Sequence, residues 1–133
     1  MPSGYSGTPL AAKLGLKAGQ RVWRDGMPAS VADEIGETGA ILLQAPAPPI
    51  DLAHIFVTER KALTEQLTAL YSLLAPAGAI WVSWPKKAAK VATDVTEDTI
   101  RDICLPMGLV DVKVCAVDTI WSGLKLVIRK DRR

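Results

Sequence analysis

The sequence predicts an α/β fold in which a mostly parallel sheet is flanked by helices and ends in a C-terminal antiparallel hairpin. Three observations support this: apolar segments of strand length alternate with helical patterns, a proline–glycine turn joins a helix to a buried strand at 79–84, and two strand-like segments close the chain. A length of 133 residues predicts a single α/β domain spanning 1–133. Within it we expect an N-terminal arm at 1–9 and a solvated basic tail at 129–133.

The first part of the chain predicts two short helices and two strands. Segments 10–14 and 29–35 each hold two apolar residues four positions apart and are followed by a glycine, which is typical of a short helix and its end. Apolar residues at 21–24 and 39–44 predict strands. Three prolines make 45–50 a stiff connector, because proline fixes φ and lacks an N–H.

The central part predicts a strand, a helix and a second strand. Segment 51–57 has an apolar centre and predicts a strand. The clearest helix opens at Thr58 and Glu59, because leucines then recur on one face, and we expect Pro76 to end it. The strand at 79–84 runs into two lysines.

A polar loop over 86–95 precedes the last predicted helix. Asp94 and Glu97 have the spacing of a capping box, so we expect this helix to begin there. The segment 105–108 contains a proline and a glycine and ends the helix.

The C-terminal hairpin combines segments 109–118 and 124–129. Alternation in the first segment predicts a half-buried strand with four apolar residues on one face, which are Val110, Val112, Val114 and Ala116. Because an open, valine-rich edge can pair with another chain, a homodimer or a protein partner is a possible consequence.

Composition excludes several classes of protein. The net charge of +2 is too small to favour nucleic acid or an anionic membrane, and no apolar run approaches the roughly 20 residues of a membrane helix. No secretion signal is visible at the N-terminus. The two cysteines, Cys104 and Cys115, are expected to be free thiols of a cytoplasmic protein.

Two segments resemble parts of the class I S-adenosylmethionine-dependent methyltransferase fold, a Rossmann-like sheet that ends in an antiparallel hairpin. Residues 16–22 are similar to the approach to its first strand, and residues 73–81 are similar to a helix, turn and strand late in the fold. The family's glycine-rich loop is replaced by Trp23–Pro28, which has one glycine, and Gln44–Pro46 lacks the acidic residue expected for a ribose. We therefore expect a reduced version of this fold and no cofactor, with S-adenosylmethionine doubtful.

The whole chain also resembles a family of small bacterial proteins through three motifs. They are Gly4–Leu10, Trp84–Lys87 and Trp121–Lys125. This resemblance implies a bacterial protein and brings no biochemical activity with it.

The predicted topology brings three strand ends to one edge of the sheet, where open α/β sheets bind ligands. The candidate ligand-binding residues at this edge are Asp25, Gly26, Arg60, Ser83, Trp84, Lys86 and Lys87. The three basic residues among them predict a site for a small anion, and Trp84 could stack on a planar group.

The sequence shows no catalytic constellation. His54 is the only histidine and lies in an apolar segment, without the neighbours of a metal site. We therefore expect a non-catalytic binding or regulatory module without a metal. The alternative is an enzyme, either a degenerate or atypical methyltransferase or one with other chemistry on a small anionic substrate at the strand ends.

Overall fold

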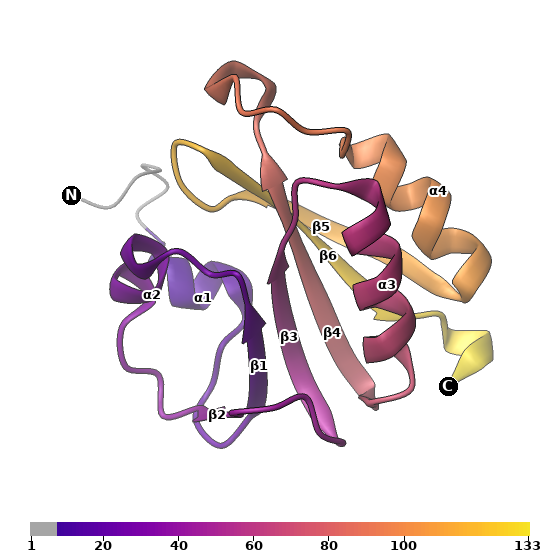
Figure 1. Ribbon diagram of the computed structural model, residues 1–133. Helices are drawn as coiled ribbons and strands as arrows, with labels where there is room; N and C mark the ends of the chain where they lie inside the picture. Colours follow the sequence, from indigo (N-terminus) through magenta and orange to yellow (C-terminus); the bar gives the residue numbers. More distant parts are fainter. Residues whose placement is uncertain (1–7) are drawn as a thin grey trace.

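A six-stranded mixed sheet forms the centre of the computed structural model, which describes residues 8–133 (Figure 1). The strands are β1 (Arg21–Asp25), β2 (Ile41–Leu42), β3 (Ile50–Phe56), β4 (Leu74–Pro85), β5 (Leu109–Ala116) and β6 (Trp121–Ile128). The α-helices are α1 (Leu10–Leu14), α2 (Ala29–Ile35), α3 (Arg60–Tyr71) and α4 (Glu97–Met107), with 3-10 turns η1 (Lys87–Ala89) and η2 (Lys130–Arg132). Most of the predicted arm at 1–9 lies outside the described residues.

The strand order is β2-β1-β3-β4-β6-β5. The first four of these strands are parallel, β6 is antiparallel to β4, and β5 is antiparallel to β6. This arrangement confirms the predicted mostly parallel sheet with a C-terminal antiparallel hairpin.

Helices cover both faces of the sheet and create two hydrophobic cores (Figure 1). Helices α3 and α4 pack on one face, where Leu63, Leu67 and Ile100 are buried. Helices α1 and α2 pack on the other face. Trp81 belongs to the core under α1 and α2, whereas Trp84 belongs to the core under α3 and α4, because positions three apart in a strand point to opposite faces.

The end of α3 differs from its prediction. The helix stops at Tyr71 rather than at Pro76, because the chain turns there and Ile50 donates its N–H to the carbonyl of Leu73 at 2.9 Å. Strand β4 therefore begins at Leu74, and Gly78 lies inside it. A Cβ atom at Gly78 would lie 2.7 Å from the carbonyl oxygen of Ile50, so the close approach of β3 to β4 requires glycine at this position.

The N-terminal cap of α4 is also different from its prediction. Thr96 is the N-cap, and its side chain and that of Thr99 form a reciprocal capping box. Asp94 lies before the helix and accepts the N–H of Arg60 at 2.6 Å instead. The Asp94–Glu97 spacing was misleading because a neighbouring threonine pair has the same spacing of three.

Both edge strands are more exposed than the sequence predicts. The strand expected over 39–44 is reduced to β2, whose Ile41 and Leu42 are 51% and 53% exposed. In β5 an irregularity between Asp111 and Lys113 interrupts the alternation, so Val112 and Val114 are 55% and 56% exposed. The four apolar residues predicted for one face of this strand therefore do not form a buried face.

The basic tail makes both backbone and side-chain hydrogen bonds with the body of the protein. Arg129 donates its N–H to the carbonyl of Gly108 at 2.9 Å, and Arg133 Nε donates to the carbonyl of Ile128 at 2.8 Å. The segment between them forms η2, whose side chains are exposed.

Candidate functional site

The carboxyl ends of β1, β3 and β4 lie at the same edge of the sheet, as predicted. The seven candidate residues at this edge do not form one site, because they divide between the two faces of the sheet and because several are already bonded to neighbouring groups.

Asp25 and Gly26, at the end of β1, contact α3 and the end of β3. Asp25 faces α3 and accepts a hydrogen bond from Gln66 Nε2 at 2.6 Å. Gly26 has φ +70°, and a Cβ atom there would lie 3.2 Å from the carbonyl oxygen of Phe56. The turn after β1 therefore packs against the end of β3.

Ser83 lies on the α1 and α2 face, away from Trp84. It is fully buried, and its Oγ is 2.7 Å from Nε2 of His54, which is 2% exposed. Burial, together with the charge of Arg24, lowers the pKa of His54 to about 3, so the imidazole is neutral at pH 7. His54 stacks on Phe56, whose ring in turn meets Trp121 edge-on. The pair joins β3 to β4 within the core.

Arg60 begins α3, and its backbone contacts the 86–95 loop. Its backbone N–H donates to Asp94, and its side chain is exposed and is not part of the pocket described below. Arg60 is therefore not among the residues that line the pocket with the two lysines.

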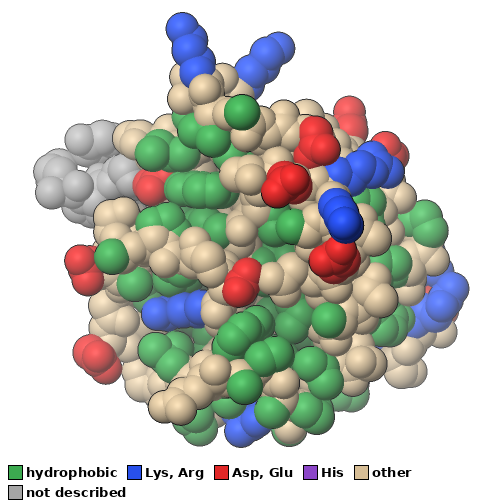
Figure 2. Space-filling view, viewed as in Figure 1, with side chains coloured by type: hydrophobic (Ala, Val, Ile, Leu, Met, Phe, Trp, Pro, Cys, Tyr) green, Lys and Arg blue, Asp and Glu red, His purple; other side chains and the backbone are tan. Residues whose placement is uncertain are grey.

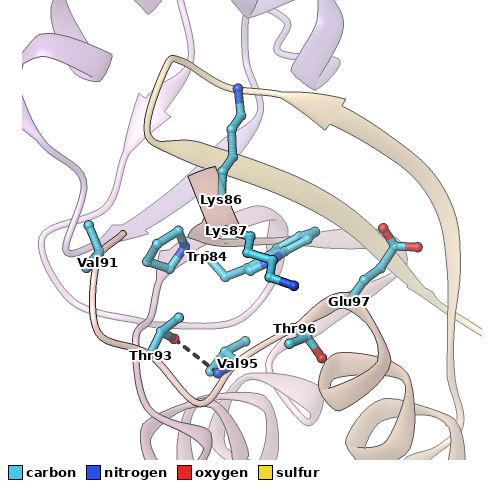
Figure 3. Close-up of a pocket in the computed structure, with 9 residues that line it drawn as sticks. Trp84, Lys86, Lys87, Val91, Thr93, Val95, Thr96 and Glu97 are labelled. Carbon is cyan, nitrogen blue, oxygen red and sulfur yellow. Dashed lines mark hydrogen bonds between the residues drawn. The ribbon is translucent and has the colours of Figure 1, made fainter. Parts of the chain in front are cut away.

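Trp84, Lys86 and Lys87 line a pocket of about 480 Å³ between the end of β4 and the start of α4 (Figure 3). Its walls combine apolar groups with a few polar side chains. The lining residues are Trp84, Pro85, Lys86, Lys87, Val91, Thr93, Val95, Thr96 and Glu97. Those between Val91 and Glu97 could not be assigned to the site from sequence, because their convergence depends on how the loop folds back.

The two lysines have different roles in this pocket. Lys86 Nζ donates to the carbonyl of Asp118 at 2.6 Å, and its backbone N–H donates to the carbonyl of Ile120 at 2.7 Å. Figure 3 shows Lys86 pointing away from the other labelled side chains and Lys87 extending over Trp84. Lys86 therefore ties the pocket to the β5–β6 turn, and the ammonium of Lys87 is the one available to a ligand.

The loop over 86–95 is held at its other end by the start of α3. Thr93 Oγ1 donates to the carbonyl of Thr58 at 2.7 Å and accepts the N–H of Val95 at 3.0 Å. Asp94 donates its N–H to the same carbonyl at 3.3 Å. Because both ends are bonded, the loop holds its side of the pocket in place.

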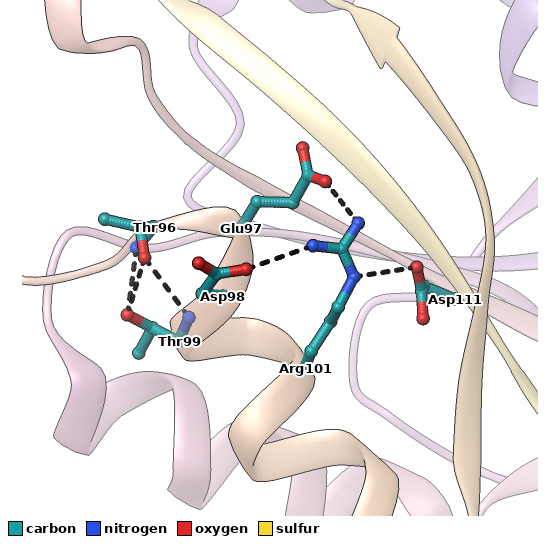
Figure 4. A network of polar contacts seen from close by, with 6 residues as sticks. All are labelled: Thr96, Glu97, Asp98, Thr99, Arg101 and Asp111. Carbon is teal, nitrogen blue, oxygen red and sulfur yellow. Dashed lines mark hydrogen bonds and ion pairs between the residues drawn. The ribbon is translucent and has the colours of Figure 1, made fainter.

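Acidic groups surround Arg101 on the α4 side of the pocket (Figure 4). Its guanidinium contacts Glu97, Asp98 at 3.3 Å and Asp111 at 3.0 Å. The hydrogen bonds to Asp111 and Glu97 raise the pKa of Arg101. Three carboxylates around one guanidinium leave a net charge of −2 (3 negative, 1 positive) in this cluster.

The surface view shows the same division of charge. Basic side chains project from the end of the molecule where η1 lies in Figure 1, and acidic side chains gather beside them over the start of α4 (Figure 2). The other charges on this face are of mixed sign.

Neither cysteine has the features of a reactive thiolate. Burial raises the pKa of Cys104 to about 11 and also raises that of Cys115. Both thiols are free.

Across residues 8–133, no group of three or more His, Cys, Asp or Glu side chains is placed to hold a metal ion. None of the helices in this part of the chain is both long and apolar enough to cross a bilayer.

Several methyltransferases of known structure have a similar fold. A SAM-dependent methyltransferase from Aquifex aeolicus is 16% identical, with a TM-score of 0.59 over 88% of this chain and 86% of that protein. Ribosomal protein L11 methylase from Lactobacillus delbrueckii subsp. bulgaricus is 12% identical, with a TM-score of 0.58 over 90% and 75% of the two chains. Magnesium protoporphyrin IX methyltransferase from Synechocystis PCC 6803, solved with bound SAM, is 12% identical, with a TM-score of 0.57 over 91% and 74%.

These similarities confirm the predicted Rossmann-like, methyltransferase-like fold, and at such low identity they extend to the fold alone. No protein-family model matches the sequence, and no curated protein matches it either.

Proposed function

We propose that this protein is a binding module that holds a small ligand with an anionic group in the pocket beside Trp84. One observation carries the proposal: the ammonium of Lys87 lies at an apolar pocket at the carboxyl end of β4 and has no bonded partner among the described residues. Such a pocket suits a ligand whose apolar body is buried and whose anionic group reaches the lysine.

The polar groups of the pocket favour binding over catalysis. Thr93 and Thr96 are engaged in the loop and in the cap of α4, and Glu97 is paired with Arg101. His54 and Ser83, the one histidine–hydroxyl pair in the described residues, are buried on the opposite face of the sheet. The pocket therefore offers no nucleophile with an adjacent base.

The second candidate function is methyl transfer, which the fold favours because a structural neighbour was solved with bound SAM. The residues at the end of β1 favour the binding module over an adenosyl cofactor. Gly26 packs on the carbonyl of Phe56, and the proline at position 28 has no N–H to donate to the carboxylate of the cofactor.

A binding measurement separates the two functions. We expect 3-phenylpropionate, as an apolar anion, to shift backbone NMR signals of the 86–97 segment and to raise the melting temperature. Lys87→Met should weaken its binding about tenfold, whereas Lys90→Met, in the same loop but outside the pocket lining, should leave it unchanged. Stabilisation by S-adenosylmethionine without any response to 3-phenylpropionate would instead support methyl transfer.

We also propose that the β5 edge receives a second copy of this chain. Its support is the exposure of Val112 and Val114 on a strand that pairs only with β6 among the described strands.

A cytoplasmic location without nucleic-acid or membrane partners remains our proposal, supported by free thiols and a net charge of +2.

A further inference from the structure

Two oppositely charged side chains line the pocket without pairing with each other. Lys87 and Glu97 both line it. Among residues 8–133, however, the ion pairs belong to Arg101 and Arg129, so the ammonium of Lys87 and the carboxylate of Glu97 do not contact each other. A pocket lined by two opposite charges that do not pair with each other suits a guest that carries both charges itself.

The negative side of this pocket is not neutralised by its own arginine. Glu97 uses one carboxylate oxygen, Oε2, on Arg101, which leaves Oε1 free to accept a hydrogen bond. Arg101 is shared with Asp98 and Asp111, and the cluster keeps its negative excess. A ligand that was only an anion would be attracted by Lys87 and repelled by this cluster.

The positive side is more than one side chain. The ammonium of Lys86, which also lines the pocket, donates to the carbonyl of Asp118. A ligand that was only a cation would therefore be repelled from this side. Between the two sides lie apolar groups, which are Trp84, Pro85, Val91 and Val95.

We propose that the ligand of this pocket is a zwitterion with an apolar or aromatic body, that is, a free α-amino acid or a molecule of that chemistry. Its carboxylate binds Lys87, its ammonium binds Glu97, and its side chain lies on the apolar wall beside Trp84. A volume of about 480 Å³ is within the usual range for small-molecule sites. This inference rests on the proposed function, and it adds the cationic group to the ligand.

Four ligands that share one phenyl body test the inference by NMR titration. They are L-phenylalanine (zwitterion), 3-phenylpropionate (anion), phenethylamine (cation) and 3-phenylpropionamide (neutral). We expect L-phenylalanine to bind about fivefold to tenfold more tightly than either singly charged ligand, because each charge-assisted contact contributes on this scale at a partly exposed site.

Two variants test which pocket residue binds each charged group of the ligand. Glu97→Gln should remove the advantage of L-phenylalanine over 3-phenylpropionate, and Lys87→Met should remove its advantage over phenethylamine. Asp98→Asn is the matched control for the first, because Asp98 also contacts Arg101 but does not line the pocket. Lys90→Met is the control for the second. Both controls should keep the wild-type order of affinities.

The outcomes separate this inference from the proposed function. If 3-phenylpropionate binds as tightly as L-phenylalanine and Glu97→Gln leaves the ratio of the two affinities unchanged, the proposal of a zwitterionic ligand is wrong and the proposal of an anion site stands. If neither carboxylate ligand binds at tens of millimolar, both the proposal of an anion site and the proposal of a zwitterionic ligand are wrong.

Discussion

The imidazole of His54 and the hydroxyl of Ser83 form a hydrogen bond of 2.7 Å in the core, between two parallel strands. Both residues are buried, and a buried polar group is costly unless it is bonded. Each side chain satisfies the other, so the pair stabilises the register of β3 against β4 without being accessible to a substrate.

This pair predicts acid sensitivity. The pKa of His54 falls from 6.5 in the unfolded chain to about 3 in the folded protein, so the unfolded chain binds the proton first as the pH falls. The contribution of His54 to stability is complete above about pH 6.5 and is lost as the pH falls towards 3. We expect a loss of about 2 kcal/mol in the free energy of unfolding between pH 7 and pH 5, measured by urea denaturation.

The His54→Gln variant isolates this effect from carboxylates that titrate in the same range. It should be less stable than the wild type at pH 7, and the difference should shrink by about 2 kcal/mol at pH 5. Parallel loss of stability in both proteins would show that His54 is not the group responsible.

The cap of α4 predicts a measurable loss of stability. Thr96→Ala removes the acceptor for the N–H of Thr99 at 3.2 Å and should lower the free energy of unfolding by about 1 kcal/mol. The control is Thr64→Ala, an exposed hydroxyl inside α3 that donates to the carbonyl of Arg60 and should change stability by less than about 0.5 kcal/mol. Equal effects of the two substitutions, in chemical denaturation, would contradict the role of Thr96 as the cap.

The element pattern of this chain could be predicted because hydrophobic spacing and glycine positions are local signals. The helices ended by Gly15 and Gly36 have the predicted bounds, and the first strand of the hairpin begins at the predicted residue, whereas the second begins at Trp121 instead of Leu124. The end of α3 and the face of β5 depend on partners elsewhere in the chain. A one-residue irregularity opposite β6 was enough to expose Val112.

The site was predicted less well for the same reason. The sequence placed Trp84, Lys86 and Lys87 at a strand end, and all three line the pocket. It could not show that Ser83 bonds to His54 on the opposite face, or that Glu97 lines the pocket with Lys87, because strand pairing and loop path are set by tertiary contacts. The predicted set therefore contained one side of a charged pocket.

Gly78 predicts a large steric effect inside β4. In Gly78→Ala the added methyl group would lie 2.7 Å from the carbonyl of Ile50 and 2.9 Å from that of Ala75, so two backbone segments must move. We expect a loss of about 2 kcal/mol in the free energy of unfolding. Gly19→Ala is the comparison, because Gly19 has φ +85° but open space around its Cβ position, and it should cost about 1 kcal/mol from backbone strain alone. A smaller loss at Gly78 than at Gly19, in thermal or urea unfolding, would contradict the close approach of β3 to β4.

The β5 edge predicts weak self-association. Val112 and Val114 are more than half exposed on a strand whose outer side is unpaired among the described strands, although the irregularity at Val112 and the charge of Lys113 limit how far a second copy can pair. Analytical ultracentrifugation at several hundred micromolar should show a concentration-dependent rise in mean mass, which Val114→Lys should abolish because it places a charge on the edge. Lys61→Ala, on the exposed face of α3, should associate like the wild type. A wild-type protein that stays strictly monomeric at these concentrations would show that Lys113 and the irregular strand are sufficient to block the edge, and the proposed second copy would then be wrong.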